Sequence, residues 1–156
     1  MVSWLRKFLQ PKREPDFLIG PSKEDPYLRR WWLIPRNKFF NIYLHHMIHD
    51  DEDRAPHDHP WASLSLCLEG YIEEHQLVDV KQNLWTINGI FAGDWKWRGT
   101  TYLHKLKLPR GDAWTLFFTG PVVRVWGFQC PQGWREWKKF VNPRNKGEPG
   151  LGCGEE

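Results

Sequence analysis

The motif His57-Asp58-His59 limits what this chain can fold into more than any other feature. In a β-strand, residues i and i+2 point to the same face, so both imidazoles can face one ion while the carboxylate between them turns away. His104, on a second strand, would complete a face of three imidazoles and leave coordination positions open. The chain is therefore expected to bring two distant strands together around a metal ion.

Short apolar or alternating stretches, separated by glycine and proline turns, predict an all-β domain. One turn is expected at Asn88-Gly89, a pair that is typical of β-hairpins. Many short antiparallel strands indicate a barrel or a sandwich. The predicted strands span residues 41–48, 61–68, 72–80, 84–87, 102–108, 114–119 and 122–128.

The segments around these strands suggest one domain with extensions. At 156 residues the chain can bury a single core. Helices are expected at residues 3–10 and 134–140 from their apolar spacing. We divide the chain into an N-terminal arm (1–26), a barrel (27–141) and a C-terminal tail (142–156). The tail is expected to be flexible because it is rich in proline, glycine and charge and lacks apolar periodicity.

Composition narrows the range of partners and compartments. The net charge of +3 is mild and its charges are interspersed, which argues against a nucleic-acid partner. No apolar run approaches the about 18 residues of a membrane span, so neither a membrane partner nor a signal peptide is expected. Cys67, Cys130 and Cys153 are odd in number and far apart. A disulfide framework is therefore not expected. We expect a location in the reducing cytoplasm.

The residues around the histidine pair resemble the first motif of the cupin superfamily, G(X)5HXH(X)3-4E(X)6G. His57, His59 and Gly70 stand in that register. Asp51 replaces the first glycine and Ser63 replaces the glutamate.

The second cupin motif, G(X)5PXG(X)2H(X)3N, finds Gly93 and His104 at the matching separation. The resemblance covers roughly residues 41–128. The run TLFFTGPVVRVWGF, residues 115–128, is similar to a segment of small uncharacterised bacterial and phage cupins. The second motif is not matched at Gly99, Thr101 and Leu108.

The resemblance implies a fold and a chemistry. The fold would be an antiparallel double-stranded β-helix, the cupin jelly-roll barrel, with short peripheral helices. The metal would be held by His57, His59 and His104. Three histidines without the glutamate resemble the cupin branch of thiol dioxygenases, which oxidise small thiols with Fe(II) and O2. Ser63 stands where that branch can carry a crosslinked cysteine, so a thiol substrate is not singled out.

Alternation along the strand that follows the histidine pair predicts its two faces. Trp61 and Ser63 share the metal-bearing face and are candidate substrate contacts in a cavity for a small molecule. The opposite face carries the leucines of residues 64–68 and must be covered. A second sheet, the N-terminal arm or the partner in a homodimer are the three alternatives.

Three further residues are candidates for the site. Tyr102 shares the face of His104 and is a candidate catalytic residue. Arg124 and Trp126 share another face. If that face points inward, Arg124 is placed to bind a carboxylate and to take part in catalysis, with Trp126 as a substrate contact. If it points outward, Arg124 is a solvated surface residue.

Histidine and acidic residues outside the motif have alternative interpretations. His45 lies on the preceding strand and is a candidate hydrogen-bond partner of a ligand or a substrate contact. Glu73 and Glu74 form either a salt-bridged surface pair, which is the simpler interpretation, or the source of a substitute carboxylate ligand.

The ligand set predicts the chemistry of the site. Three neutral imidazoles leave a divalent ion with its full charge, which favours an anionic group in the open positions. Imidazole binds several metals, so the ligands alone do not choose among them. The resemblance to thiol dioxygenases favours Fe(II), with Zn, Ni or Mn as alternatives. The leading hypothesis is an Fe(II)-dependent, dioxygenase-like enzyme that acts on a small anionic substrate.

Three other functions stay open. A non-catalytic cupin that binds a metal or a small ligand is the first. A sugar isomerase or epimerase, with His57 or His104 as base and Tyr102 or Tyr43 as acid, is the second. A 2-oxoglutarate oxygenase with a triad made of residues 49, 51 and 104 is the third.

Overall fold

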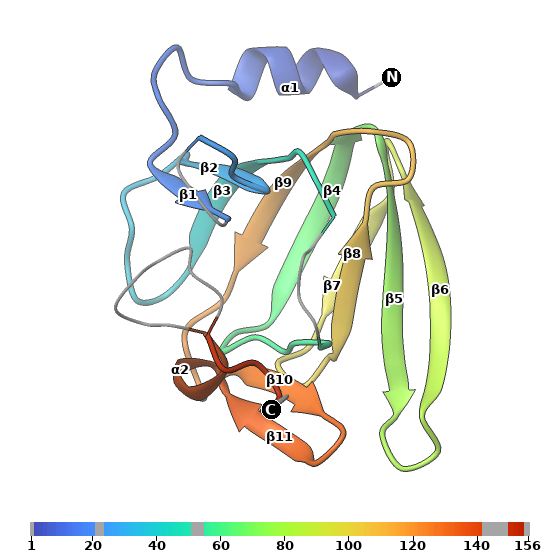
Figure 1. Cartoon of the computed structure of the whole chain (residues 1–156). Coiled ribbons are helices and arrows are strands. Elements are labelled where there is room, and N and C mark those ends of the chain that lie inside the picture. Colours follow the sequence, from blue (N-terminus) through green and yellow to red (C-terminus); the bar gives the residue numbers. More distant parts are fainter. Residues whose placement is uncertain (1, 21–23, 51–54, 142–149, 155–156) are drawn as a thin grey trace.

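Two antiparallel sheets face each other and enclose the interior of a barrel in the computed structural model, which describes residues 2–20, 24–50, 55–141 and 150–154 (Figure 1). The larger sheet has the strand order β1-β2-β3-β9-β4-β7, and the smaller has the order β6-β5-β8. A separate hairpin, β10-β11, lies at one end. The elements are α1 (Ser3–Leu9), β1 (Phe17–Ile19), β2 (Leu28–Trp32), β3 (Asn41–Met47), β4 (Ser63–Glu69), β5 (Tyr71–Asp79), β6 (Leu84–Phe91), β7 (Trp95–Arg98), β8 (His104–Lys107), β9 (Ala113–Thr119), β10 (Gly127–Cys130), β11 (Gly133–Glu136) and α2 (Trp137–Phe140).

An apolar cluster between the two sheets holds one end of the barrel together. Strands β2, β3, β4 and β9 supply it from the larger sheet, and β5, β6 and the residue that follows β8 supply it from the smaller. Each fully buried large apolar side chain contributes about 1.5–3 kcal/mol relative to an exposed one. The histidines lie in the polar part of the barrel interior, beyond this apolar cluster. The cluster consists of Leu28, Met47, Cys67, Ile72, Ile90, Leu108 and Ala113.

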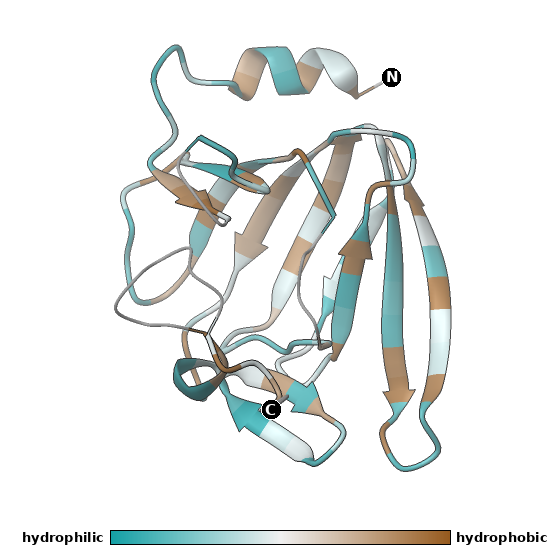
Figure 2. Ribbon diagram, in the orientation of Figure 1, coloured by the Kyte–Doolittle hydropathy of each residue, from teal (hydrophilic) through white to brown (hydrophobic). Residues whose placement is uncertain are grey.

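Part of the outer face of the larger sheet is covered by the N-terminal arm, whereas Trp95 and Trp97 of β7 on that face are 56% and 64% exposed. Brown hydrophobic bands alternate with near-white bands along β4 (Figure 2). Leu66 and Leu68 of its outward face are 6% and 0% exposed, and Leu5 and Leu9 of α1 pack against their cluster. A hydrogen bond of 2.8 Å from Arg6 Nε to a carboxylate at the end of β4 fixes the helix. Of the three alternatives for covering these leucines, the structure shows the arm over Leu66 and Leu68, and a homodimer partner stays a prediction.

The turn expected at Asn88-Gly89 is wrong, because β6 runs through both residues. Gly89 pairs with Glu73 of the neighbouring strand β5. A Cβ at Gly89 would lie 2.9 Å from the hydroxyl of Tyr71, so the glycine admits an aromatic ring across the strands rather than a turn. The chain turns earlier, at residues 80–83, where Asn83 has a φ of 49°.

The strand expected at residues 122–128 is also wrong. Residues 120–126 contain no strand, and only Gly127 and Phe128 belong to β10. Val122 and Val123 are 70% and 66% exposed, so their apolar character does not reflect burial in a sheet. β10 instead pairs with β11, which takes up part of the predicted helix 134–140 and leaves α2 with a single turn. Among the described residues, no helix has the length and hydropathy needed to cross a membrane.

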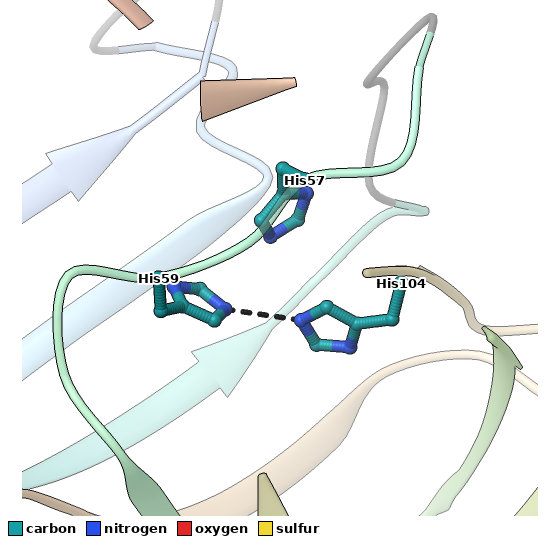
Figure 3. A group of neighbouring side chains, drawn as sticks. All are labelled: His57, His59 and His104. Carbon is teal, nitrogen blue, oxygen red and sulfur yellow. Dashed lines mark hydrogen bonds between the residues drawn. The ribbon is translucent and has the colours of Figure 1, made fainter. Parts of the chain in front are cut away.

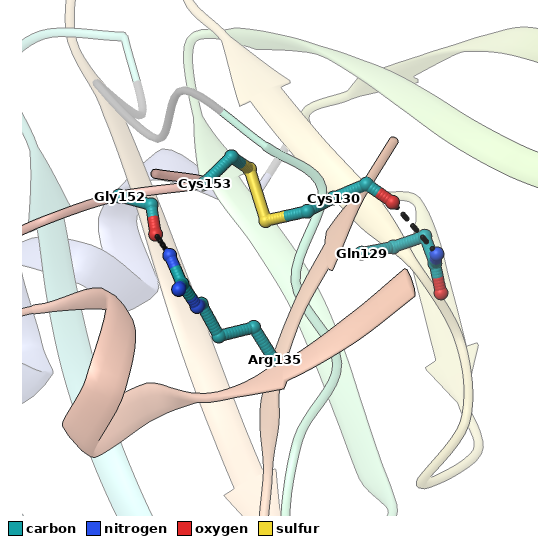
Figure 4. The surroundings of a disulfide bond; sticks show 5 residues. All are labelled: Gln129, Cys130, Arg135, Gly152 and Cys153. Atoms are coloured by element: carbon teal, nitrogen blue, oxygen red, sulfur yellow. Dashed lines mark hydrogen bonds between the residues drawn. A yellow bond between two sulfur atoms is a disulfide. The ribbon is translucent and has the colours of Figure 1, made fainter. Parts of the chain in front are cut away.

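The expectation that the cysteines form no disulfide is wrong, because Cys130 and Cys153 form a disulfide bond (Figure 4). The two residues are 23 apart in the sequence, and their proximity depends on residues 150–154 folding back onto β10. The amide of Gly152 donates to the carbonyl of Phe140 at 3.0 Å, and Arg135 donates to the carbonyl of Gly152 at 2.5 Å. The cysteine pattern therefore no longer supports a reducing compartment. Of the tail expected to be flexible, residues 142–149 and 155–156 lie outside the described residues, and 150–154 are anchored.

Candidate metal centre

His57, His59 and His104 come together at one end of the barrel interior, as the motif predicts (Figure 3). One ligand nitrogen from each lies within 4.8 Å of the others. The loop that enters β4 carries the first two, and β8 begins with the third. Reciprocal backbone hydrogen bonds of 3.0 Å join His57 and His104 in an isolated antiparallel bridge. The sequence predicted that two strands would carry the histidines, but only one isolated β-bridge joins the two segments. This bridge holds the His57-Asp58-His59 segment beside His104.

The geometry of this histidine cluster fits a metal ion. His59 Nε2 and His104 Nε2 are 3.0 Å apart. Two nitrogens that each bind a metal at about 2.1 Å, at right angles, are separated by about 3.0 Å. The cluster therefore has the spacing of two neighbouring positions in a coordination sphere.

The protonation states of the cluster also fit. Burial, together with the neighbouring charges of His57 and Arg98, lowers the pKa of His104 to about 3. Burial likewise holds the pKa of His59 well below 6.5. Both rings are neutral at pH 7, so a metal ion would displace no proton from a charged imidazolium.

Glu74 fixes the orientation of the third histidine. Its carboxylate is 0% exposed and accepts a hydrogen bond of 2.9 Å from His104 Nδ1. With the proton on Nδ1, the lone pair of Nε2 is free for a metal. Burial by itself raises the pKa of Glu74, but the hydrogen bond from His104 and the charge of Arg98 more than offset it. The pKa therefore lies well below its usual range, and the group is a carboxylate.

The surface-pair interpretation of Glu73 and Glu74 is wrong for the second residue. Glu73 points outward and contacts His75 at 2.6 Å, whereas Glu74 points into the barrel. The two-residue period of β5 contained this information, because it places Ile72, Glu74 and Gln76 on one face. A carboxylate that shares a strand face with an apolar residue such as Ile72 indicates an inward-facing polar residue.

Two cations and a hydroxyl contact the same carboxylate, and the cations offset its charge. Arg98, 4% exposed, donates from Nε to Glu74 at 2.6 Å and from Nη1 to Ser65 at 2.8 Å. Lys96 Nζ lies 3.0 Å from the second oxygen, to which the Tyr102 hydroxyl donates at 2.9 Å. Burial, and then the nearby charge of Glu74, raise the pKa of Tyr102. Tyr102, a predicted catalytic residue, is therefore a protonated phenol beside the ring of His104.

Asp58 anchors the loop that carries the first two histidines. It is 2% exposed and turns away from the ion site, as the motif predicts. Its carboxylate accepts hydrogen bonds from the amide of Gly127 at 2.8 Å, from Trp134 Nε1 at 3.0 Å and from Arg124 Nη1 at 2.5 Å. Arg124 also donates to the carbonyl of Thr100 at 2.8 Å. The structure thus pairs Arg124 with a protein carboxylate, and its catalytic role stays a prediction.

The predicted substrate contacts lie around the histidines. Trp61 stacks on His59, with ring centroids 4.5 Å apart. The ring of Trp126 lies 6.3 Å from that of His57. Ser63 is 2% exposed, and within the described part of the chain its hydroxyl has no hydrogen-bond partner. Two aromatic rings and a buried hydroxyl thus line the surroundings of the site.

The alternative triad made of residues 49, 51 and 104 does not form a cluster in the part of the chain that the structure describes. His49 Nε2 contacts Asp25 at 3.1 Å, and its side chain is 51% exposed. Residue 51 lies outside the described residues. The histidines that converge are those of the cupin motif.

The comparisons with known proteins agree with this architecture. No protein-family model and no curated protein sequence matches the chain. Among solved structures, Fe(II)-HppE with the alternative substrate (S)-1-HPP is 17% identical, with a TM-score of 0.54 over 71% of this chain. The match spans only 58% of HppE. An uncharacterised protein with a double-stranded β-helix domain from Klebsiella pneumoniae subsp. pneumoniae is 16% identical, with a TM-score of 0.51 over 76% of this chain and 97% of its own.

A third similar structure is hydroxypropylphosphonic acid epoxidase from S. wedmorenis. It is 15% identical, with a TM-score of 0.52 over 70% of this chain and 59% of its own. At these identities the likeness concerns the fold. Together with the two facing sheets and the histidine motif, it shows that this chain has a cupin-like fold, a double-stranded β-helix.

Proposed function

We propose that this chain is an Fe(II)-dependent cupin enzyme that oxidises a small anionic molecule with O2. The observation that carries the proposal is the histidine cluster, in which two neutral imidazole nitrogens lie 3.0 Å apart inside the barrel. Iron is favoured over other divalent metals because the similar HppE structure is described as an Fe(II) protein. That protein is longer than the part this chain matches, so its chemistry supports the choice of metal and not a choice of substrate.

The residues around the cluster have separate tasks in this proposal. When bound, ferrous iron would supply redox chemistry and open coordination positions. Glu74 keeps the proton of His104 on Nδ1, and Asp58 keeps the histidine loop against β10. Trp61 stacks on His59 and shields one side of the site from water.

The charges near the site favour an anionic substrate. Arg98 and Lys96 both contact Glu74, so this carboxylate does not reduce the positive charge of an ion held by neutral imidazoles. A site with excess positive charge binds anionic groups in its open positions. The positive charges of Arg98 and Lys96 therefore support the anionic substrate that the three neutral imidazole ligands predict.

Metal analysis and O2 uptake test the proposal. The metal-free protein is reconstituted with Fe(II) under anaerobic conditions, and iron per chain is measured for the wild type and for His57→Ala/His104→Ala. His75→Ala is the matched control, because His75 contacts Glu73 outside the cluster. We expect about one iron per chain in the wild type and the control, and a loss in the double variant.

The iron-loaded protein is then mixed with a panel of small carboxylates, phosphonates and thiols in an oxygen electrode. O2 consumption that depends on one of these compounds and on iron supports the enzyme. Iron binding without O2 consumption would instead support the non-catalytic metal-binding alternative. Equal iron in the wild type and the double variant, or none in either, would refute the metal centre itself.

A further inference from the structure

Among the residues that the structure describes, Arg30 is a cation in the barrel wall without an acidic partner. It lies on β2, partly buried, and its Nε donates to Nε2 of His45 at 2.8 Å. Its guanidinium carbon lies 4.9 Å from the ring centroid of Tyr43. These are its contacts in the described part of the chain, and no carboxylate is among them.

The contacts of Arg30 do not neutralise its charge. Burial, and then the charge of Arg30 itself, hold the pKa of His45 well below 6.5, so this histidine is a neutral acceptor. Tyr43 offers only the face of its ring. The comparable arginines of the barrel are paired: Arg98 with Glu74 and Arg124 with Asp58. A partly buried guanidinium without a counterion is costly, so its position suits an anion that the chain does not supply.

The free edge of Arg30 has the shape of an oxyanion site. Nε is used by His45, which leaves Nη1 and Nη2 as two parallel donors. Such an edge binds carboxylate or phosphonate oxygens in pairs. Contact with the ring of Tyr43 restrains the guanidinium, so little side-chain entropy is lost on binding.

Aromatic rings connect Arg30 to the histidine cluster. The ring of His45 stacks on Phe117 at 4.8 Å, Phe117 meets Trp61 at 5.7 Å, and Trp61 stacks on His59 at 4.5 Å. Arg30 and the histidines therefore border the same interior.

Two buried hydroxyls lie on this inner face as well. Ser63 and Thr119 are opposite each other on β4 and β9 and are 2% and 3% exposed. In the described part of the chain neither hydroxyl has a hydrogen-bond partner. Buried hydroxyls normally have a partner, so they mark a position for a polar group of a ligand or for water.

We propose that Arg30 is the anion-binding residue of this barrel, and that it holds the carboxylate or phosphonate group of a small organic molecule whose other end faces the three histidines. Anion binding by Arg30 does not depend on the metal centre. The orientation of the other end of the molecule toward the histidines rests on the proposed function. Tyr43 and Phe117 would line the space between the two ends.

The test measures anion binding in metal-free protein, so that a failure of the metal centre does not affect it. The probes are glycolate, methylphosphonate and the neutral counterpart glycolamide. Binding is followed by the arginine Nε–H signals in 1H–15N NMR spectra, in which Arg30→Lys identifies the signal of Arg30. We expect glycolate or methylphosphonate to shift this signal with a Kd of about 0.1–10 mM, and glycolamide to leave it unchanged.

Two variants separate charge from structure. Arg30→Gln keeps a donor for His45 and removes the charge, and we expect it to bind the anions about 10- to 100-fold more weakly. Arg29→Gln is the matched control, because Arg29 is the exposed neighbour on the opposite face of β2. It should bind as the wild type does. The wild-type comparison of glycolate with glycolamide needs no variant, so it decides the question even if Arg30→Gln does not fold.

Three results would overturn the proposal: equal shifts with glycolate and glycolamide, anion binding that Arg30→Gln leaves intact, or no shift of the Arg30 signal with either anion. The two anions differ in shape, so the tighter of them identifies the oxyanion group. A protein that binds anions through Arg30 but no iron through the histidines would confirm the anion site and refute the proposed oxidation.

Discussion

Replacing Glu74 by glutamine tests whether one buried carboxylate supports both the barrel and the histidine cluster. The substitution keeps the shape of the side chain and removes its charge. Arg98, which is 4% exposed and lies 2.6 Å from Glu74, then becomes a buried cation without a counterion. Breaking such a pair costs about 3–5 kcal/mol, a large part of the about 5–15 kcal/mol that stabilises a typical domain.

The assay is urea denaturation of metal-free protein, followed by tryptophan fluorescence. For Glu74→Gln we expect the free energy of unfolding to fall by about 3–5 kcal/mol and the melting temperature by about 6–20 °C. Glu73→Gln is the matched control, since the side chain of Glu73 is 28% exposed and its carboxylate contacts His75 outside the barrel interior. Its loss should stay below about 1 kcal/mol.

Two further measurements separate the roles of Glu74. The double variant Glu74→Gln/Arg98→Met removes both charges, and it should recover most of the lost stability. Metal affinity should fall about 10- to 100-fold in Glu74→Gln, because His104 loses the carboxylate that fixes its Nδ1 proton. A loss of stability no larger than that of Glu73→Gln would refute the reasoning.

Two other predictions concern the whole domain. Cys130→Ala/Cys153→Ala should lower the free energy of unfolding by about 3 kcal/mol in urea denaturation without reductant, because the disulfide closes a loop of 23 residues; equal stability of the variant and the oxidised wild type would contradict this. Metal-free protein should also lose stability in mild acid. The pKa values of His45 and His59 lie well below 6.5 and that of His104 is about 3, whereas in the unfolded chain these rings titrate near 6.5. Below that pH the unfolded state binds more protons, so the free energy of unfolding should fall by about 3–4 kcal/mol per pH unit between about pH 6 and pH 5; urea midpoints that stay constant across this range would contradict it.

Sequence patterns predicted the parts of the fold that depend on local periodicity. Alternation after His59 correctly placed Ser63 on the inner face and Leu66 on the outer one. The same rule failed at residues 122–126, where exposed valines follow an alternating pattern without a neighbouring strand. The turn predicted at Asn88-Gly89 was wrong for a related reason. The glycine is required there because the ring of Tyr71 on the adjacent strand leaves no room for a side chain.

For the site, the sequence by itself determined the three histidines, because their spacing fits a two-residue period and a known pair of motifs. Only the tertiary structure decided which groups support them. Glu74 and His104 are 30 residues apart, and Asp58 and Arg124 are 66 apart. That Arg30 has no carboxylate partner among the described residues likewise becomes visible only in the tertiary structure. Periodicity fixes the face on which a side chain lies, whereas strand order and register fix its neighbours, and these arise from packing across the whole chain.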